Sequence, residues 1–508
     1  MSHVSTRIDF RANVQRVPSN IPPSVRKATM RFLGTRANVV DVVGDERWEQ
    51  LRQAGHDIRL HTINHLDHYL AQLETSVTLA GGMVHWATDA AHANQIVIEI
   101  AREHNCKRAV KVKSMASEEI GLNHALAEAG IQATETDLGE YIVQLAGTTP
   151  SHIIVPAVHL TKEGIADLFR AKLGVDAPPD PIKLCAIARE KLREEFLSAE
   201  MGISGANFMV ADSGTLVIVT NEGNGRMCTT LPPLHVAIVG IDKVVPDFEA
   251  VNVLLKLLPR SATGQKMSSY TSFITGPRRT NDEGGPQEFH LVLLDNGRTR
   301  VLRDSVARET LLCIRCGVCL NVCPVYNNVG GHAYGAVYSG PIGSILAPQL
   351  LGTKIAGDLP FASTLCGACA DYCPVKIPIP KILLRLRQRV VEGDRVENAV
   401  ASPQFNRGAR LGSIAFSNSF LYEWGTRAMT ILQAPFKRGN WLHNLPPPFN
   451  RWTNVRPFPA FGADFRAWFR QRTPEGRVRD QKRQFGIGLA LAGIATFIAV
   501  IVTRRKKR

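Results

Sequence analysis

Three short motifs that commonly mark a cofactor or nucleotide site are missing from the 508-residue sequence. It contains no C-x-x-C-H sequence, no G-x-x-x-x-G-K-[ST] loop, and no G-x-G-x-x-G segment after a predicted strand. Covalently attached haem, nucleotide hydrolysis and a dinucleotide fingerprint therefore have no support. We assign no catalytic residue from the sequence and expect the substrate chemistry to come from a partner.

The N-terminal residues lack an apolar run of the kind found in secretory leaders, so we expect a cytoplasmic body. Cysteine is also scarce outside two short clusters, which hold seven of the ten cysteines. The other three, Cys106, Cys185 and Cys228, are scattered through apolar or mixed sequence, and we predict that they are buried and inert. This is not a disulfide pattern, and a reducing compartment leaves the clustered thiols available as ligands.

Positive charge is concentrated near the C-terminus. Residues 434–508 hold 16 lysines and arginines against three acidic residues, although the whole chain has a net charge of +15. This region has no recognisable nucleic-acid-binding module, so we expect no nucleic-acid partner. A membrane surface fits better, because residues 485–502 form an uncharged, mostly apolar run of 18 residues.

As a helix this run would span roughly 27 Å, against a hydrocarbon core of about 30 Å. We therefore predict a transmembrane helix at 485–503 that anchors the body to the membrane. Cationic residues flank the run on both sides, which leaves its orientation open.

The rest of the chain divides by its pattern into four regions. Residues 1–70 have the apolar spacing of helices, and 71–300 alternate β-branched runs with helical stretches, which indicates an α/β domain with a largely parallel sheet. Residues 301–394 are expected to be mostly helical, and 395–484 form a basic, proline- and aromatic-rich arm that we expect to be extended. Within the α/β region the predicted strands are 108–114, 141–147, 152–158, 214–224, 235–245 and 289–295, and a helix is predicted at 180–202.

Two cysteine clusters lie in the helical region. The first reads C-x2-C-x2-C-x3-C-P from Cys313 to Pro324, an arrangement in which three thiolates hold one iron–sulfur cluster and the fourth reaches a second cluster. The second copy, at 363–374, has serine at its first position. We assign a first ligand set of Cys313, Cys316, Cys319 and Cys373, and a second ligand set of Cys323, Cys366 and Cys369, with Ser363 or an outside group as a possible fourth ligand.

The alternative for these cysteines is zinc, but a closed zinc site uses four ligands and would leave three cysteines without a role. We therefore expect two iron–sulfur clusters, both most simply [4Fe–4S], with [3Fe–4S] as an alternative for the second ligand set. Two neighbouring clusters in one helical module would conduct single electrons.

Five segments carry a resemblance to a known family: 111–145, 211–226, 313–326, 330–348 and 363–387. They resemble the lactate utilisation protein B family, and the similarity runs from about residue 30 to about residue 470. The resemblance implies a lactate-utilisation (LUD) domain with an α/β fold similar to CoA-transferase and formyltetrahydrofolate cyclo-ligase relatives, followed by a two-cluster ferredoxin domain.

The family implies a role in oxidising L-lactate to pyruvate beside two partner subunits. One partner carries cysteine-rich CCG motifs and the other is a second LUD-domain subunit. This chain has no Cys-Cys dipeptide, so it is not the CCG subunit.

Polar residues of the LUD region fall at predicted strand ends or helix starts, where α/β folds bind ligands. They are Ser114, Glu118, Glu119, Asp137, Glu140 and the loop 220–224. The segment around Ser114 is equally consistent with an ordinary helix start, with serine as the cap and glutamates complementing the dipole. His61, His65 and His68 could suggest a metal, but a solvated helical face is the simpler interpretation.

Three functional hypotheses follow. In the first, the chain passes electrons from lactate oxidation through two clusters to a membrane acceptor such as quinone. In the second, the LUD domain is a ligand-binding or transferase-like unit and the clusters are structural. In the third, the chain is mainly a scaffold that docks its partners to the bilayer.

Overall fold

The computed structural model describes residues 7–394, 399–400, 403–447, 450–453, 456–461, 468–469 and 472. The chain divides into two compact units, Met1–Ala401 and Ser402–Arg508. The first unit contains both the α/β region and all ten cysteines.

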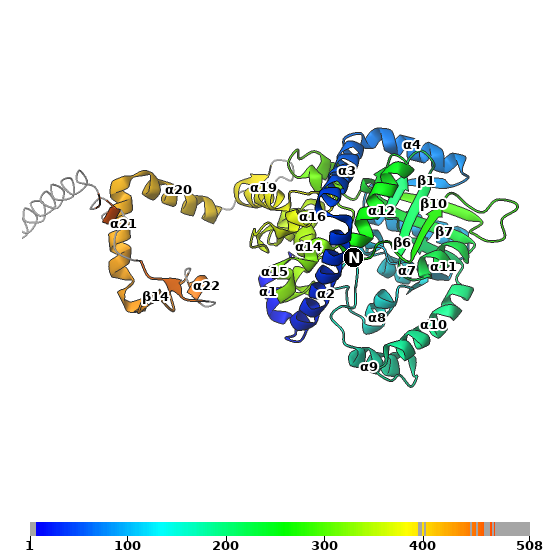
Figure 1. Cartoon of the computed structure of the whole chain (residues 1–508), viewed down its shortest axis with the longest axis horizontal. Coiled ribbons are helices and arrows are strands. Elements are labelled where there is room, and N and C mark those ends of the chain that lie inside the picture. Colours follow the sequence, from blue (N-terminus) through cyan, green and yellow to red (C-terminus); the bar gives the residue numbers. More distant parts are fainter. Residues whose placement is uncertain are drawn as a thin grey trace, which may run out of the picture. The chain divides into compact units, whose positions relative to one another are not determined.

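Four helices open the first unit, in agreement with the helical spacing of the sequence. They are α1 Phe10–Arg16, α2 Ile21–Val43, α3 Asp45–Asn64 and α4 Leu66–Leu79. Gly44, with a φ of +84°, is the single residue between the end of α2 and the start of α3. Helices α2 and α3 pack against α12 (Phe248–Ala262), and α2 also packs against the cysteine-bearing helices (Figure 1).

A six-stranded parallel sheet forms the centre of the α/β region, in the order β1-β10-β7-β4-β2-β3. Every residue of the central strand β7 is buried, because strands flank it on both sides, α5 and α7 pack on one face, and α4 together with the second sheet packs on the other. Val236 of β7 pairs with Ile203 on one side and with His290 on the other. The strands are β1 Met83–Ala87, β2 Arg108–Lys111, β3 Gln132–Glu135, β4 Met201–Ser204, β7 Leu234–Gly240 and β10 Glu288–Leu294.

A second sheet has four strands in the order β8-β5-β6-β9, with both parallel and antiparallel pairs. Its strands are β5 Phe208–Val210, β6 Thr215–Thr220, β8 Val244–Val245 and β9 Tyr270–Ile274. The α/β architecture with a parallel sheet is therefore present as predicted. The helices that cover the sheets are α5 Ala90–Glu103, α6 Met115–Glu119, α7 Leu122–Glu128, α8 Leu138–Ala146, α9 Lys162–Leu173, α10 Pro181–Ser198 and α11 Asn224–Thr230, with a 3-10 turn η1 at Ile241–Lys243.

Two predicted strands are wrong. Residues 141–146 lie in helix α8 and Gly147 caps it, and residues 152–158 form irregular backbone without a strand. Periodicity cannot separate a short apolar run in a strand from one in a buried helix. The sequence feature that indicates a helix here is Asp137. Its side chain caps α8 by accepting the backbone N–H of Glu140 at 3.2 Å.

The cysteine-bearing part of the first unit is built from short helices around α16 (Gly340–Leu351), in which only Leu351 is not buried. It packs against α14 and α19. The other elements are α13 Arg298–Leu302, η2 Arg308–Leu312, α14 Val318–Asn321, α15 Pro324–Val329, η3 His332–Tyr334, α17 Thr353–Ala356, η4 Leu359–Phe361, α18 Ala368–Asp371, α19 Ile379–Glu392 and the strand pair β11 Gly393–Asp394 with β12 Ala399–Val400.

The second unit differs from the extended arm that its composition suggested, because α20 (Pro403–Ser417) and α21 (Ser419–Leu432) are helices. Asn418 separates them, and its side chain accepts the N–H groups of Phe420 and Leu421 to start α21. The remaining elements are η5 Ala434–Phe436, β13 Lys437–Arg438, β14 Trp441–Leu442, α22 Asn450–Thr453 and β15 Phe458–Pro459.

Across the residues that the structure describes, none of the helices combines the length and apolar character needed to cross a bilayer. The predicted transmembrane segment at 485–503 lies outside those residues.

Candidate metal centre

The two cysteine loops have the same backbone course, which the shared motif spacing explains. Arg315 and Leu365 occupy equivalent positions with φ of 60° and 56°, and Gly317 and Gly367 follow with φ of 76° and 90°. These left-handed residues turn the chain back on itself before α14 and α18 respectively. Each loop can therefore present several side chains to one point.

Gly317 is required for a second reason. A Cβ at this position would lie 3.0 Å from Ile154 and 3.2 Å from His152. The loop thus packs directly against the irregular segment 152–158 of the α/β region, which was predicted to be a strand.

Backbone N–H groups point at sulfur in both loops. The N–H of Arg315 donates to Cys313 Sγ at 3.4 Å, and that of Ile377 donates to Cys373 Sγ at 3.4 Å. Cys323 caps α15 and accepts the N–H of Tyr326 at 3.5 Å. Such donors favour the thiolate, which is the form that binds a metal.

The first ligand set meets at one cavity. Cys313, Cys316, Cys319 and Cys373 all line it, and all four residues are buried. The rest of the lining is apolar: Ile153, Ile314, Gly317, Val318, Ile342, Pro374, Val375, Ile377 and Ile379. Burial raises the pKa of the Cys373 thiol to about 11, and nearby Cys313 contributes to the increase.

The second ligand set is also brought together, but it lies nearer to solvent. Burial raises the pKa of the Cys369 thiol to about 12, with Cys323 and Cys366 close enough to raise it further. Cys323 and Cys369 are buried, Cys366 is exposed and Ser363 is half-buried. Cys319 lies in α14 and Cys369 lies in α18, and these two helices pack against each other, so the two sets are neighbours.

These residues fit iron–sulfur clusters. Burial in an apolar pocket raises the pKa of these thiols, so ionising them without a cation nearby costs free energy. Bound iron stabilises the thiolates and removes that cost. In the described part of the chain, no three or more His, Cys, Asp or Glu side chains lie so close together that they could hold a single metal ion.

Buried charges surround Cys313 and fasten the first loop to the α/β region. Lys243 Nζ donates to the carbonyl oxygen of Cys313 at 3.0 Å, and the Arg315 guanidinium lies 3.6 Å from Asp242 Oδ2. The fully buried Asp242 also accepts from Arg298 Nε at 2.6 Å. Burial lowers the pKa of Lys243 to about 7, and the neighbouring Arg315 charge lowers it as well.

Arg59 adds a further cation to this group. Its fully buried guanidinium donates to the carbonyl oxygens of Leu311 and Leu312, directly before Cys313. Sequence reasoning missed this group because its members come from four distant segments of the chain.

The polar residues predicted in the LUD region separate into two groups. Glu118 lies beside Lys111, with Glu118 Oε1 2.9 Å from Lys111 Nζ, whereas Glu119 pairs with Arg298 at 2.9 Å and accepts from the Tyr338 hydroxyl at 2.8 Å. Consecutive residues of a helix point about 100° apart, which explains why the neighbours Glu118 and Glu119 pair with different partners. Ser114 caps α6 by accepting the N–H of Ser117, as the simpler interpretation predicted.

The first of these groups lies at the carboxyl ends of β2 and β3 and is called the LUD polar cluster below. It consists of Lys111, Lys113, Glu118, Glu135, Glu140 and Glu222. Lys111 Nζ lies 2.6 Å from Glu135 Oε1, and Lys113 Nζ lies 3.9 Å from Glu140 Oε1. Burial raises the pKa of Glu140 to about 8. Glu222, from the predicted loop 220–224, accepts the N–H of Leu138, and burial together with Asp137 raises its pKa to about 7.

This polar cluster lies next to the first ligand set. Lys113 Nζ donates to the carbonyl oxygen of Ile154 at 2.7 Å, and the adjacent Ile153 lines the cysteine cavity. His152 contacts the cysteine-bearing part through Asn321 Oδ1 at 3.1 Å. One short segment therefore joins the LUD polar cluster to the metal centre.

The remaining candidates have ordinary surroundings. His61, His65 and His68 are exposed, and the His61 ring pairs with the Tyr69 hydroxyl at 2.9 Å. Cys106 and Cys228 are buried as predicted, but Cys185 is exposed, because it faces solvent on the amphipathic helix α10.

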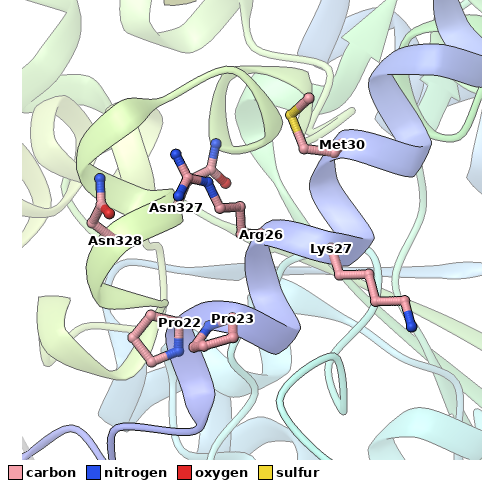
Figure 2. A pocket seen from close by; sticks show the side chains of 7 residues that line it. All are labelled: Pro22, Pro23, Arg26, Lys27, Met30, Asn327 and Asn328. Carbon is pink, nitrogen blue, oxygen red and sulfur yellow. The ribbon is translucent and has the colours of Figure 1, made fainter.

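A shallow hollow lies between the start of α2 and α15, as Figure 2 shows. None of its residues was predicted as a site residue, and no thiol or carboxylate lines it. Its lining consists of Pro22, Pro23, Arg26, Lys27, Met30, Asn327 and Asn328.

Comparison with known proteins agrees with the division into an α/β region and a cysteine-bearing region. The LUD domain family matches residues 70–294, and the 4Fe-4S dicluster domain family matches residues 309–377. Lactate utilization protein B from Shouchella clausii (strain KSM-K16) is 46% identical over 457 residues, which cover 89% of this chain and 94% of that protein. The protein of the same name from Macrococcus caseolyticus (strain JCSC5402) is 46% identical over 433 residues, covering 84% of this chain and 90% of that protein.

The chain belongs to the lactate utilization protein B family. It therefore has a role in lactate utilisation and an iron–sulfur dicluster domain, most simply of the [4Fe–4S] type. Among solved structures, a DUF162 family protein from Deinococcus radiodurans aligns with 45% of this chain and 98% of its own length, at 13% identity and a TM-score of 0.26.

Proposed function

We propose that this chain is the iron–sulfur electron-transfer subunit of a complex that oxidises L-lactate to pyruvate, and that Cys313, Cys316, Cys319 and Cys373 hold one cluster while Cys323, Cys366 and Cys369 hold the other. When bound, the two clusters supply one-electron transfer between donor and acceptor. The observation that carries the proposal is the apolar cavity lined by all four cysteines of the first ligand set.

The residues of the chain perform three tasks in this function. The thiolates bind iron, the backbone N–H groups of Arg315, Tyr326 and Ile377 stabilise negative charge on sulfur, and the apolar lining excludes water. The exposure of Cys366 supports the second ligand set as the point at which a partner exchanges electrons.

The partners proposed from the family are a CCG-motif iron–sulfur subunit and a second LUD-domain subunit, with a membrane quinone as the final acceptor. The apolar run 485–502 would anchor a cytoplasmic body beside that acceptor. Reconstitution tests this arrangement: the chain and both partners should reduce a quinone analogue with L-lactate, and omission of this chain should stop quinone reduction.

A second candidate function rests on the LUD polar cluster. In the described part of the chain, Glu140 Oε1 and Asn224 Oδ1 are buried without a hydrogen-bond partner, which suits a polar ligand. In that case the LUD domain binds the ligand and the clusters are structural. The two functions separate in one assay, because L-lactate with the partners bleaches redox-active clusters and leaves structural clusters oxidised.

A scaffold role makes a third prediction. A variant without clusters would still assemble the complex and support turnover.

A further inference from the structure

Ser363 occupies the position in the second loop that Cys313 occupies in the first. Each lies two residues before a residue with left-handed backbone, Leu365 or Arg315, and four residues before a glycine with positive φ. The match is one of backbone course and not only of sequence spacing.

The hydrogen bonds of the two positions match as well. The N–H of Leu365 donates to Ser363 Oγ at 3.1 Å, as the N–H of Arg315 donates to Cys313 Sγ at 3.4 Å. The Ser363 oxygen is therefore held in the same relation to its loop as the sulfur of Cys313. The carbonyl of Ser363 is fixed separately, by Arg387 Nη2 at 3.1 Å.

We propose that Ser363 Oγ is the fourth ligand of the second ligand set, which then holds a [4Fe–4S] cluster with three thiolates and one serine oxygen. The proposal rests on the two clusters of the proposed function and adds the ligand that the cysteine count leaves missing. The serine hydroxyl releases its proton to solvent as the oxygen–iron bond forms.

The iron bound by Ser363 is the most weakly held iron of the two clusters. An oxygen ligand is harder than thiolate and matches a cluster iron less well. Ser363 is half-buried and the neighbouring Cys366 is exposed, whereas all four residues of the first ligand set are buried. Iron bound at Ser363 is therefore the iron that leaves on oxidation.

This loss of iron is a one-electron oxidation of the cluster. A one-electron oxidant such as ferricyanide removes one electron from [4Fe–4S]2+, the iron at the serine corner departs as Fe2+, and [3Fe–4S]+ remains. The serine oxygen recovers a proton from solvent.

The test compares three variants with the unaltered chain, all loaded with clusters under anaerobic conditions. Ser363→Cys supplies a stronger ligand, Ser363→Ala removes the oxygen, and Thr364→Ala is a matched control that removes the adjacent exposed hydroxyl. Iron and acid-labile sulfide are counted, and the paramagnetic [3Fe–4S]+ signal is recorded during titration with ferricyanide.

The unaltered chain and Thr364→Ala should form the [3Fe–4S]+ signal at the same oxidant concentration. Ser363→Cys should require at least tenfold more oxidant, and Ser363→Ala should show the signal as isolated, with one iron fewer per chain. The proposal is overturned if Ser363→Ala keeps its iron and titrates like the unaltered chain, or if Ser363→Cys leaves the titration unchanged.

Ser363→Cys alone decides the matter if Ser363→Ala does not fold. Failure of the proposed function looks different, because an unaltered chain that binds no iron and sulfide would contradict the clusters themselves.

Discussion

The Arg315 guanidinium lies 3.6 Å from Asp242 Oδ2, which connects the first cysteine loop to the end of the central strand of the parallel sheet. Arg315 also lies over the Tyr338 ring, 4.9 Å from its centroid. The positive charge of Arg315 is therefore held beside Cys313 by Asp242 of the α/β region and Tyr338 of the cysteine-bearing region. In this position it can influence the reduction potential of the cluster.

Replacing Arg315 by leucine should lower the reduction potential of the cluster at the first ligand set. Reduction adds negative charge, and a buried cation nearby favours that charge. The expected decrease is tens of millivolts, where about 60 mV corresponds to a tenfold change in a one-electron equilibrium. Leucine is the residue at the equivalent position 365 of the second loop.

A redox titration followed by electron paramagnetic resonance measures this effect. Arg315→Lys is the control, because it keeps a positive charge and should shift the potential much less. An unchanged potential in Arg315→Leu would mean that the cations around Cys313 serve only the packing of the loop.

Replacing Cys316 by alanine should disrupt the cluster of the first ligand set and lower the bound iron by at least one atom per chain, because only three thiolates then remain at the cavity. Cys185→Ala is the matched control, since Cys185 is exposed on α10. Iron, sulfide and visible absorbance report the result. Equal iron in both variants would contradict the assignment of Cys316.

Replacing Glu140 by glutamine should stabilise the protein at alkaline pH. Burial raises the folded-state pKa of Glu140 to about 8, so the folded state holds a proton that the unfolded chain releases above its ordinary value of about 4.5. This contribution to stability is complete below pH 4.5 or so and is lost as pH rises toward 8. Lys113, Asp137, Glu135 and Glu118 face the same carboxyl group.

The expected gain at pH 8 and above is a few kcal/mol at most, because a tenfold difference in proton affinity between the folded and unfolded chain corresponds to about 1.4 kcal/mol. Urea unfolding at a series of pH values measures it, with Glu128→Gln, on the exposed face of α7, as the control. A pH profile that Glu140→Gln leaves unchanged would show that this carboxyl group is ionised in the folded protein.

The cysteine loops could be predicted from the sequence because their ligands are local: spacing alone places three thiols on one turn of chain. The buried Lys111 and the largely buried Lys113 of the LUD polar cluster were missed, since lysine is rarely buried and the segment 108–114 was interpreted only as a strand. Their spacing was nevertheless informative, because Lys111 and Lys113 are two residues apart and share one side of an extended chain.

The group around Asp242 could not be predicted at all. Asp242, Arg298 and Glu119 are far apart in the sequence and meet only in the folded chain, and no local pattern specifies their pairing. Helix α8 was missed for a different reason, because its short apolar run at 141–143 outweighed the cap at Asp137.

Deleting residues 485–508 should release the protein from membranes and leave both clusters intact, because no assigned ligand lies beyond Cys373. Membrane fractionation measures the release. Removal of the five terminal cations 504–508 alone is the control, and it should weaken binding only through lost attraction to anionic headgroups. If high salt alone strips the full-length protein from membranes, the apolar run is not inserted.

The central claim is that electrons from lactate pass through the clusters held by this chain. The most direct measurement is anaerobic addition of L-lactate to the chain assembled with its partner subunits, with the visible absorbance of the clusters recorded. The account predicts that lactate bleaches the absorbance as dithionite does, and that Cys316→Ala abolishes electron delivery to the acceptor. Without acceptor, clusters that stay oxidised while lactate is converted to pyruvate, or a Cys316→Ala complex that reduces added acceptor at the full rate, would contradict it.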